Sequence, residues 1–189
     1  IVQNSSGTST YEYNDETLAK VELDSKKINN SNVIIEYSIK VSNVGELEGY
    51  VKNIVDYIPN DLKFSSELNT DWYQTGNNLY CKALANEKIR PGETRAVKLV
   101  LTKTMTETNT GRTNNIAEIA ESYNDAGIPD INSVAGNKAQ GENDMGMADV
   151  IISVKTGEVA MYITLVVSML VILGVGIYFI EKKIINKHI

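Results

Sequence analysis

The sequence predicts a mainly β protein, an antiparallel β-sandwich of about seven strands, followed by one transmembrane α-helix near the C-terminus. Three observations predict this. Apolar and polar side chains alternate with a period of two in several segments between residues 18 and 123, as in strands with one buried face. No segment before residue 159 has a convincing helical stripe of apolar residues. Residues 159–180 are then continuously apolar or uncharged.

The clearest strands are two segments in which apolar residues recur at every second position. Ile35, Tyr37, Ile39 and Val41 alternate with polar residues, and the segment from Val97 to Leu101 repeats the pattern. Further strands are predicted at Ala19–Leu23, Gly49–Tyr57, Leu62–Ser65, Asn78–Leu84 and Thr113–Ser122. Turn clusters such as Pro59-Asn60-Asp61 and Pro91-Gly92-Glu93 separate them. About seven short strands in this length are typical of an immunoglobulin-like sandwich.

The segment from Val159 to Ile180 comprises twenty-two residues without a single Asp, Glu, Lys, Arg, His, Asn or Gln. At about 1.5 Å per residue, a helix of this length matches the ~30 Å hydrocarbon core of a bilayer. The alternative is a buried core helix, which is rarely so long and uniform. Lysines follow the span, so we expect the C-terminus in the cytoplasm and the preceding domain outside the cell.

The rest of the chain divides by composition. Residues 1–17 are polar and aperiodic, which indicates a linker or the end of a preceding module; the predicted sandwich covers 18–123. Residues 124–149 are rich in Gly, Asn and Asp and predict a flexible connector. Alternation over 150–154 predicts a short strand, and residues 150–158 lead into the span at 159–180 and a cytoplasmic tail at 181–189.

Charge and cysteine content limit the possible environments and partners. The net charge is −6 and most of the acidic residues precede the span, which argues against nucleic acid or anionic lipid surfaces as partners. Cys81 is the only cysteine, so no disulfide framework stabilises the domain. No signal peptide is visible at Ile1, and we expect the chain to be the C-terminal part of a longer exported protein.

Four ordered elements resemble a known family. The run VIIEYSIKVSNVGELEGYVKNIVDYIPNDLKF, followed by IRPGETRAVKLVLTKTM and TNNIAEI, is similar to the conserved immunoglobulin-like repeat domains of bacterial surface proteins. The shared elements are a strand ending in Ser/Thr-Asn-x-Gly, a strand ending in Asp-x-x-Pro, a Pro-Gly-Glu turn before a long strand, and an Asn-x-Ala closing strand. The resemblance covers about residues 18–122 and implies a domain that is displayed on a Gram-positive cell.

The end of the chain resembles the sorting signal that sortases recognise on Gram-positive cell-wall proteins. Ser153, Val154, Lys155, Thr156 and Gly157 precede the apolar span and the lysine-containing tail, although the usual motif has Leu and Pro in the first two places. The resemblance implies cleavage between Thr156 and Gly157 and transfer of the chain to a cell-wall amine of peptidoglycan. The alternative is a chain that keeps its helix in the bilayer.

Some immunoglobulin-like relatives form an internal Lys–Asn isopeptide bond beside a buried carboxylate. By that pattern the candidates are Lys20, Asn115 and Asp56. The parity of the predicted strands places Asn115 and Asp56 inside the sandwich, whereas Lys20 is out of phase with Val21 and faces water. The alternative is a hydrogen-bonded core asparagine and a turn-capping aspartate.

Two further groups of side chains could bind ligands. Asp125, Asp130 and Asp144 could supply oxygen ligands to calcium, but their spacing fits no EF-hand loop, and a solvated acidic connector is the alternative. Tyr57, Trp72, Tyr73 and Tyr80 could form a stacking platform for a sugar or peptide, or could simply supply the core.

The sequence also limits catalysis. The only histidine is His188, beyond the span, so the domain before the span cannot form a Ser-His-Asp or Cys-His centre or a histidine-ligated zinc site. There is no Gly-rich phosphate loop. We therefore expect no cofactor and no enzymatic activity. The predicted function is a stalk that anchors a surface protein to the membrane or cell wall; the alternative is an adhesin domain that binds host matrix, a glycan or a neighbouring cell.

Overall fold

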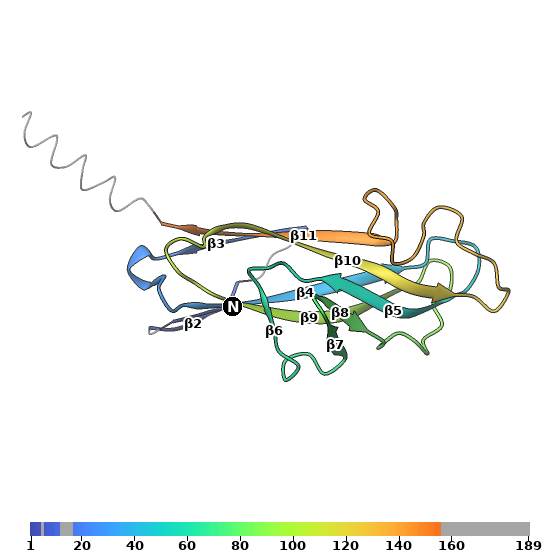
Figure 1. Ribbon diagram of the computed structural model, residues 1–189, viewed down its shortest axis with the longest axis horizontal. Helices are drawn as coiled ribbons and strands as arrows, with labels where there is room; N and C mark the ends of the chain where they lie inside the picture. Colours follow the sequence, from blue (N-terminus) through green and yellow to red (C-terminus); the bar gives the residue numbers. More distant parts are fainter. Residues whose placement is uncertain (5, 12–16, 156–189) are drawn as a thin grey trace, which may run out of the picture. The chain divides into compact units, whose positions relative to one another are not determined.

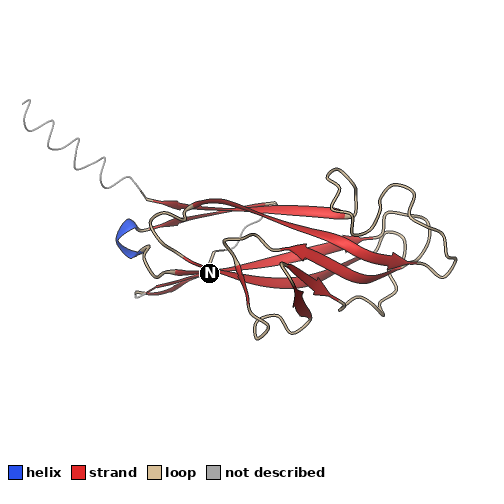
Figure 2. Cartoon of the chain, in the orientation of Figure 1, coloured by secondary structure: helices blue, strands red, loops and turns tan. Residues whose placement is uncertain are grey.

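The computed structural model describes residues 1–4, 6–11 and 17–155. These residues form a two-sheet β-sandwich of eleven strands, and the described part contains no α-helix (Figures 1 and 2). The one helical turn is a 3₁₀ segment, η1, at Ser25–Lys27. Residues up to Ser153 belong to one compact unit, and only the first two residues of the unit that follows it, Val154 and Lys155, are described.

The first sheet contains five strands in the order β2-β1-β4-β9-β6. Its two longest strands, β4 and β9, pair antiparallel over eleven residue positions, with Tyr37 opposite Leu99 at the centre. In β9, Val97, Leu99 and Leu101 point into the core, as the alternation predicted. The strands of this sheet are β1 (Val2–Asn4), β2 (Gly7–Ser9), β4 (Asn32–Ser42), β6 (Lys63–Phe64) and β9 (Thr94–Thr104).

The second sheet contains six strands in the order β3-β11-β10-β5-β8-β7. Strand β10 pairs antiparallel with β5 on one side and with β11 on the other. Its register against β5 shifts after Ile119, which is an irregularity of the β-bulge type. The strands of this sheet are β3 (Leu18–Leu23), β5 (Tyr50–Tyr57), β7 (Trp72–Thr75), β8 (Asn78–Cys81), β10 (Gly111–Tyr123) and β11 (Met145–Val154).

The mainly β sandwich is confirmed, but it contains eleven strands where about seven were predicted. All seven predicted strands are present. The strand predicted at 150–154 is also present, as the end of β11. The remaining ones are short: β7, and β1 and β2 within the segment predicted to be a linker. The prediction for the connector 124–149 was wrong at its end, because β11 already begins at Met145 and its first five residues pair with β10.

On the side of β9 that faces away from β4, backbone groups are hydrogen-bonded partly by the short strand β6 and partly by side chains. Beyond the short β6, the amide of Asn69 accepts a hydrogen bond from the Val100 N–H (2.6 Å) and donates one to the Val100 carbonyl (2.8 Å). The indole N–H of Trp72 donates to the Lys98 carbonyl at 2.7 Å. Buried backbone groups need such partners, so the loop at 65–71 performs the role of a longer edge strand.

The predicted membrane span lies outside the described residues. Among the residues that are described, no helix is long and apolar enough to cross a membrane. The prediction for 159–180 and its cytoplasmic tail at 181–189 therefore remains a prediction.

Candidate functional site

The most unusual polar group in the interior is a buried pair, Asp56 on β5 and Asn115 on β10. The Asn115 side-chain amide donates to Asp56 Oδ2 at 2.6 Å, and both residues are buried, Asp56 completely. The two strands are neighbours, and Asp56 lies opposite Ala117. Asn115 occupies the inward-facing position two residues before Ala117 on β10. The inward orientation predicted for both residues is confirmed.

Burial changes the protonation of this pair. Loss of solvent disfavours the charged carboxylate and raises the pKa of Asp56 from 3.8 to about 7, although the hydrogen bond from Asn115 acts in the opposite direction. An aspartate with this pKa exchanges its proton near neutral pH. It can therefore accept or donate a hydrogen bond according to conditions, which an ordinary surface aspartate does not do at pH 7.

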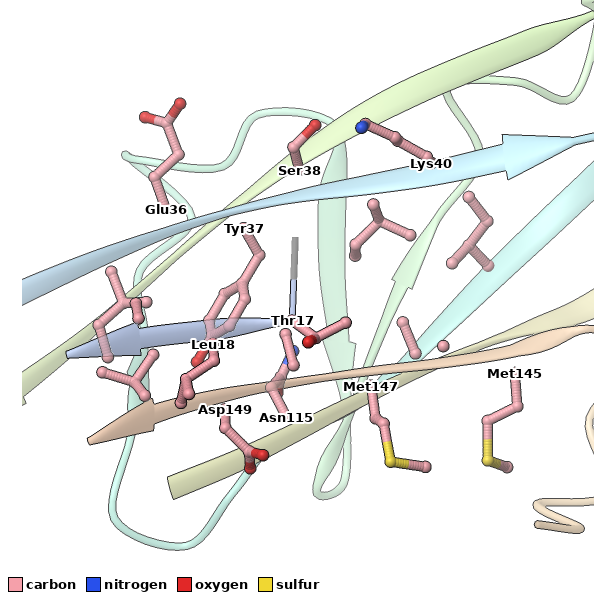
Figure 3. A pocket seen from close by; sticks show the side chains of 18 of the residues that line it. Thr17, Leu18, Glu36, Tyr37, Ser38, Lys40, Asn115, Met145, Met147 and Asp149 are labelled. Carbon is pink, nitrogen blue, oxygen red and sulfur yellow. The ribbon is translucent and has the colours of Figure 1, made fainter. Parts of the chain in front are cut away.

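Three polar atoms near this pair are buried and lack a hydrogen-bond partner within the described part of the chain. They are Asp56 Oδ1, Asn115 Oδ1 and the hydroxyl of Tyr37. Tyr37 projects inward from β4 in the opposite sheet, between β4 and β11 (Figure 3). Burial, and secondly the charge of Asp56, raises the pKa of Tyr37, so its hydroxyl stays protonated.

Tyr37 and Asn115 line a groove of about 970 Å³ between the sheets, with β4 on one side and β3, β10 and β11 on the other (Figure 3). Asp56 lies behind Asn115, to which it is hydrogen-bonded. Small residues make room for the groove. Gly146 and Ala148 of β11 lie opposite Ala117 and Asn115 of β10, and a Cβ atom added at Gly146 would find nothing within 4 Å. The groove therefore has both apolar and polar walls, and the buried amide of Asn115 and hydroxyl of Tyr37 adjoin it.

Lys20 is not part of this group. It lies on β3 with an exposed side chain, between Ala19 and the buried Val21, as its phase predicted. Of the three residues proposed for an isopeptide bond, the structure thus brings together Asp56 and Asn115 and leaves Lys20 on the outer face.

A buried lysine that the sequence reasoning missed, Lys103, lies on β9. Its ammonium bonds Asp61 Oδ2 at 2.6 Å and lies 3.5 Å from the Thr113 hydroxyl. Burial raises the pKa of Asp61, but the hydrogen bonds from Lys103 and Thr113 outweigh this and leave that pKa lowered. Lys103 shares the phase of Leu99 and Leu101, and this parity was the signal that could have identified it.

The Lys103–Asp61 pair predicts unequal effects of removing each partner. The Lys103 side chain is 3% exposed and that of Asp61 is 42% exposed. Asp61→Ala leaves a buried ammonium without its carboxylate, so we expect it to lower the free energy of unfolding by about 2–3 kcal/mol. Lys103→Met leaves an aspartate that water can solvate, and should cost less than about 1 kcal/mol. Urea unfolding of both variants measures the difference, and equal losses would contradict the unequal burial of the two charges.

The calcium candidates are not gathered into one site. Asp125 pairs with Lys88 at 3.2 Å, and Asp130 accepts hydrogen bonds within its own turn. Burial, together with neighbouring carboxylates, raises the pKa of Asp144. Within residues 1–4, 6–11 and 17–155, no three acidic, histidine or cysteine side chains could hold a metal ion together.

The four aromatic residues do not form one platform. Trp72 is buried in the core, whereas Tyr57 is half-buried on the outer face of the second sheet, where its hydroxyl donates to Glu118. Tyr73 and Tyr80 stack at a centroid distance of 5.6 Å, and Tyr73 is exposed, with the Lys82 ammonium 5.6 Å above its ring. Only Trp72 thus contributes to the interior, while Tyr73 and Tyr80 form an outer pair and Tyr57 is engaged by Glu118.

The sorting-like motif lies at the limit of the described chain. Ser153 and Val154 end β11, and the Ser153 hydroxyl lies 3.5 Å from the Val21 carbonyl. Thr156 and Gly157, between which cleavage was predicted, lie outside the described residues. Comparison with protein-family models, with curated proteins and with solved structures found no match for this chain.

Proposed function

We propose that the chain is a non-catalytic structural module of a Gram-positive cell-surface protein. In this proposal an immunoglobulin-like sandwich is held at the cell envelope by the span at 159–180, and the chain either remains in the membrane or is transferred by a sortase to peptidoglycan at Thr156. The observation that carries the proposal is the uncharged run of twenty-two residues that begins a few residues after β11 ends.

The pairing of the outermost strands supports a structural role. In the part of the chain that is described, β11 is the last strand and lies between β3 and β10, while β1 is the first strand and lies between β2 and β4. Tension transmitted along the chain would therefore act on strands that are hydrogen-bonded on both sides. The eleven-position ladder between β4 and β9 would then resist separation within one sheet.

Expression of the full chain in a Gram-positive host tests this proposal. We expect it in the membrane or wall fraction, with the sandwich accessible to protease added to intact cells. The control replaces Leu165 and Leu170 by arginine, because each arginine at the centre of a span costs about 2.5–3.5 kcal/mol of insertion. This variant should lose the envelope association. Recovery of the wild-type chain with soluble cytosolic protein would overturn the proposal.

A Thr156→Ala variant distinguishes the two kinds of anchoring. Transfer by a sortase requires the Thr156 carbonyl and releases everything from Gly157 onward, so a mature chain that ends at Thr156 would show wall linkage. A mature chain that keeps its C-terminal tail, in wild type and variant alike, would instead show retention by the membrane.

Adhesion is a second candidate function, favoured by the stacked outer pair of Tyr73 and Tyr80. Exposed aromatic faces stack on sugars and peptides, and Tyr73 is 42% exposed. A glycan array probed with the full chain and with Tyr73→Ser addresses this function. Signals that both proteins share would exclude Tyr73 from recognition.

A further inference from the structure

Three tyrosines share the outer face of the second sheet. Tyr57, Tyr80 and Tyr73 lie on the neighbouring strands β5, β8 and β7, at positions that alternate with buried residues of the core. Tyr73 is directly opposite Tyr80, and Tyr57 lies one outward position further along β5. Because neighbouring strands are ~4.8 Å apart, this tyrosine row (Tyr57, Tyr80 and Tyr73) extends over roughly 10 Å. The row is therefore long enough to contact more than one sugar residue.

The most exposed ring of the row is that of Tyr73. It stacks on Tyr80, and because β7 is the last strand in the order of this sheet, no further strand of the described chain covers its other side. The Tyr73 hydroxyl accepts a hydrogen bond from the Asn53 amide at 3.4 Å and keeps its own proton to donate. The row thus offers an aromatic surface together with a hydroxyl donor, and both suit a sugar ring.

A lysine lies beside each end of the row. The Lys82 ammonium is 5.6 Å from the centroid of the Tyr73 ring, and the Lys138 ammonium is 4.4 Å from that of Tyr57. Both lysines are exposed, and in the part of the chain that is described neither has a carboxylate within ion-pair distance. Two available cations beside aromatic rings complement a ligand that carries anionic groups.

Lys138 is held in place by its backbone. Its φ is 57°, in the left-handed region that residues other than glycine rarely adopt. Its N–H donates to both carboxylate oxygens of Glu118, at 3.0 and 3.1 Å, and Glu118 is only 1% exposed. The Tyr57 hydroxyl donates to the same carboxylate at 2.5 Å. Residues in such sparsely populated conformations concentrate at ligand sites, and here Glu118 fixes the lysine at the end of the row.

We propose that this face binds a short acidic saccharide, whose sugar rings lie across Tyr73 and Tyr80 and whose carboxylates pair with Lys82 and Lys138. This inference rests on the adhesion candidate above and adds the charge of its ligand. An acidic peptide suits the face less well, because β5 and β8 are hydrogen-bonded to strands on both sides and offer it no backbone groups. The net charge of −6 disfavours a long polyanion, so the complementarity is local and suits a short segment.

The test uses the full chain in phosphatidylcholine nanodiscs, with trigalacturonate as the acidic saccharide and its trimethyl ester as the matched neutral probe. The ester keeps the sugar rings and removes the charges. We expect saturable binding of the acid in calorimetry. The ester should bind about tenfold more weakly, because it loses the contacts with both lysines.

Four variants test the individual contacts. Lys82→Gln should weaken binding of the acid about threefold and leave that of the ester unchanged. Lys138→Gly should do the same with little change in folding stability, because glycine adopts the left-handed backbone freely. Tyr73→Ser should weaken binding of acid and ester alike. The matched control, Lys63→Gln, removes an exposed lysine from β6 of the other sheet and should bind like wild type.

Four outcomes would overturn the proposal. Equal affinity for the acid and the ester would remove the charge preference and leave the adhesion candidate, which the glycan array decides separately. Equal weakening by Lys63→Gln and Lys82→Gln would mean unspecific attraction. The third outcome is an absence of trigalacturonate binding. The fourth is binding of triglutamate as tight as that of trigalacturonate, which would assign the face to an acidic peptide.

Discussion

Replacement of Leu99 by alanine is expected to lower the free energy of unfolding by about 2–5 kcal/mol, the range for removal of a fully buried leucine side chain. Leu99 is 0% exposed and lies at the centre of β9, opposite Tyr37 on β4. The surrounding strands are held by a continuous ladder and cannot collapse into the cavity, which favours the upper part of this range. Equilibrium unfolding in urea measures the effect.

Leu68→Ala is the matched control, because it removes the same atoms from a leucine that is 49% exposed. Surface substitutions of this kind usually change stability by less than about 0.5 kcal/mol. A similar loss in both variants would mean that the two sheets do not share the packed core described here.

The strands that sequence reasoning located are those with a strong period of two. Ile35 to Val41 and Val97 to Leu101 alternate because one face of each strand is buried and the other is hydrated. The end of β11 at 150–154 was predicted, but its first half escaped because the inward positions there are Gly146 and Ala148, which give almost no hydrophobic signal. Small residues at inward positions produce the groove, so the feature that concealed the strand also forms the candidate site.

The candidate site was predicted in part for the same reason. Strand parity placed Asp56 and Asn115 inside and Lys20 outside, and the structure confirms all three orientations. Lys103 was overlooked, although parity placed it inside as well, because a buried lysine is rare unless it is paired. Its partner Asp61 lies 42 residues away in sequence, and only the folded sandwich brings the two together.

The extension of the β9 edge could not be predicted by any local rule. Asn69 lies in a loop, yet its side-chain amide forms the two hydrogen bonds that a neighbouring backbone would form with Val100. A side chain that takes the place of a strand leaves no periodic signal, since periodicity requires a run of alternating residues. Such a residue becomes visible only when the partners of buried backbone groups are traced.

Asp56→Asn is expected to abolish a large part of the pH dependence of stability between about pH 4 and pH 7. The pKa of Asp56 is about 7 in the folded chain, because burial disfavours the charged form, and returns to its ordinary value of 3.8 on unfolding. Between these values the folded state holds a proton that the unfolded state has lost. The contribution is thus fully present below pH 3.8 and is lost as the pH rises through about 7.

Integrated over that interval, the loss in the wild-type chain amounts to about 4 kcal/mol, an order-of-magnitude figure at 1.36 kcal/mol per pKa unit. Asparagine has no proton to lose, so the stability of Asp56→Asn relative to wild type should rise across this interval. Urea unfolding at several pH values measures the difference.

Asp149→Asn provides a control of opposite sign, because hydrogen bonds from Arg112 and Asn114 lower the pKa of Asp149. Removal of the Asp149 carboxylate should lower the free energy of unfolding at pH values above the pKa of Asp149 in the unfolded chain. It should have no effect at pH values below the lowered pKa of Asp149 in the folded chain. Parallel pH profiles for wild type and Asp56→Asn would show that Asp56 is hydrated in the folded chain.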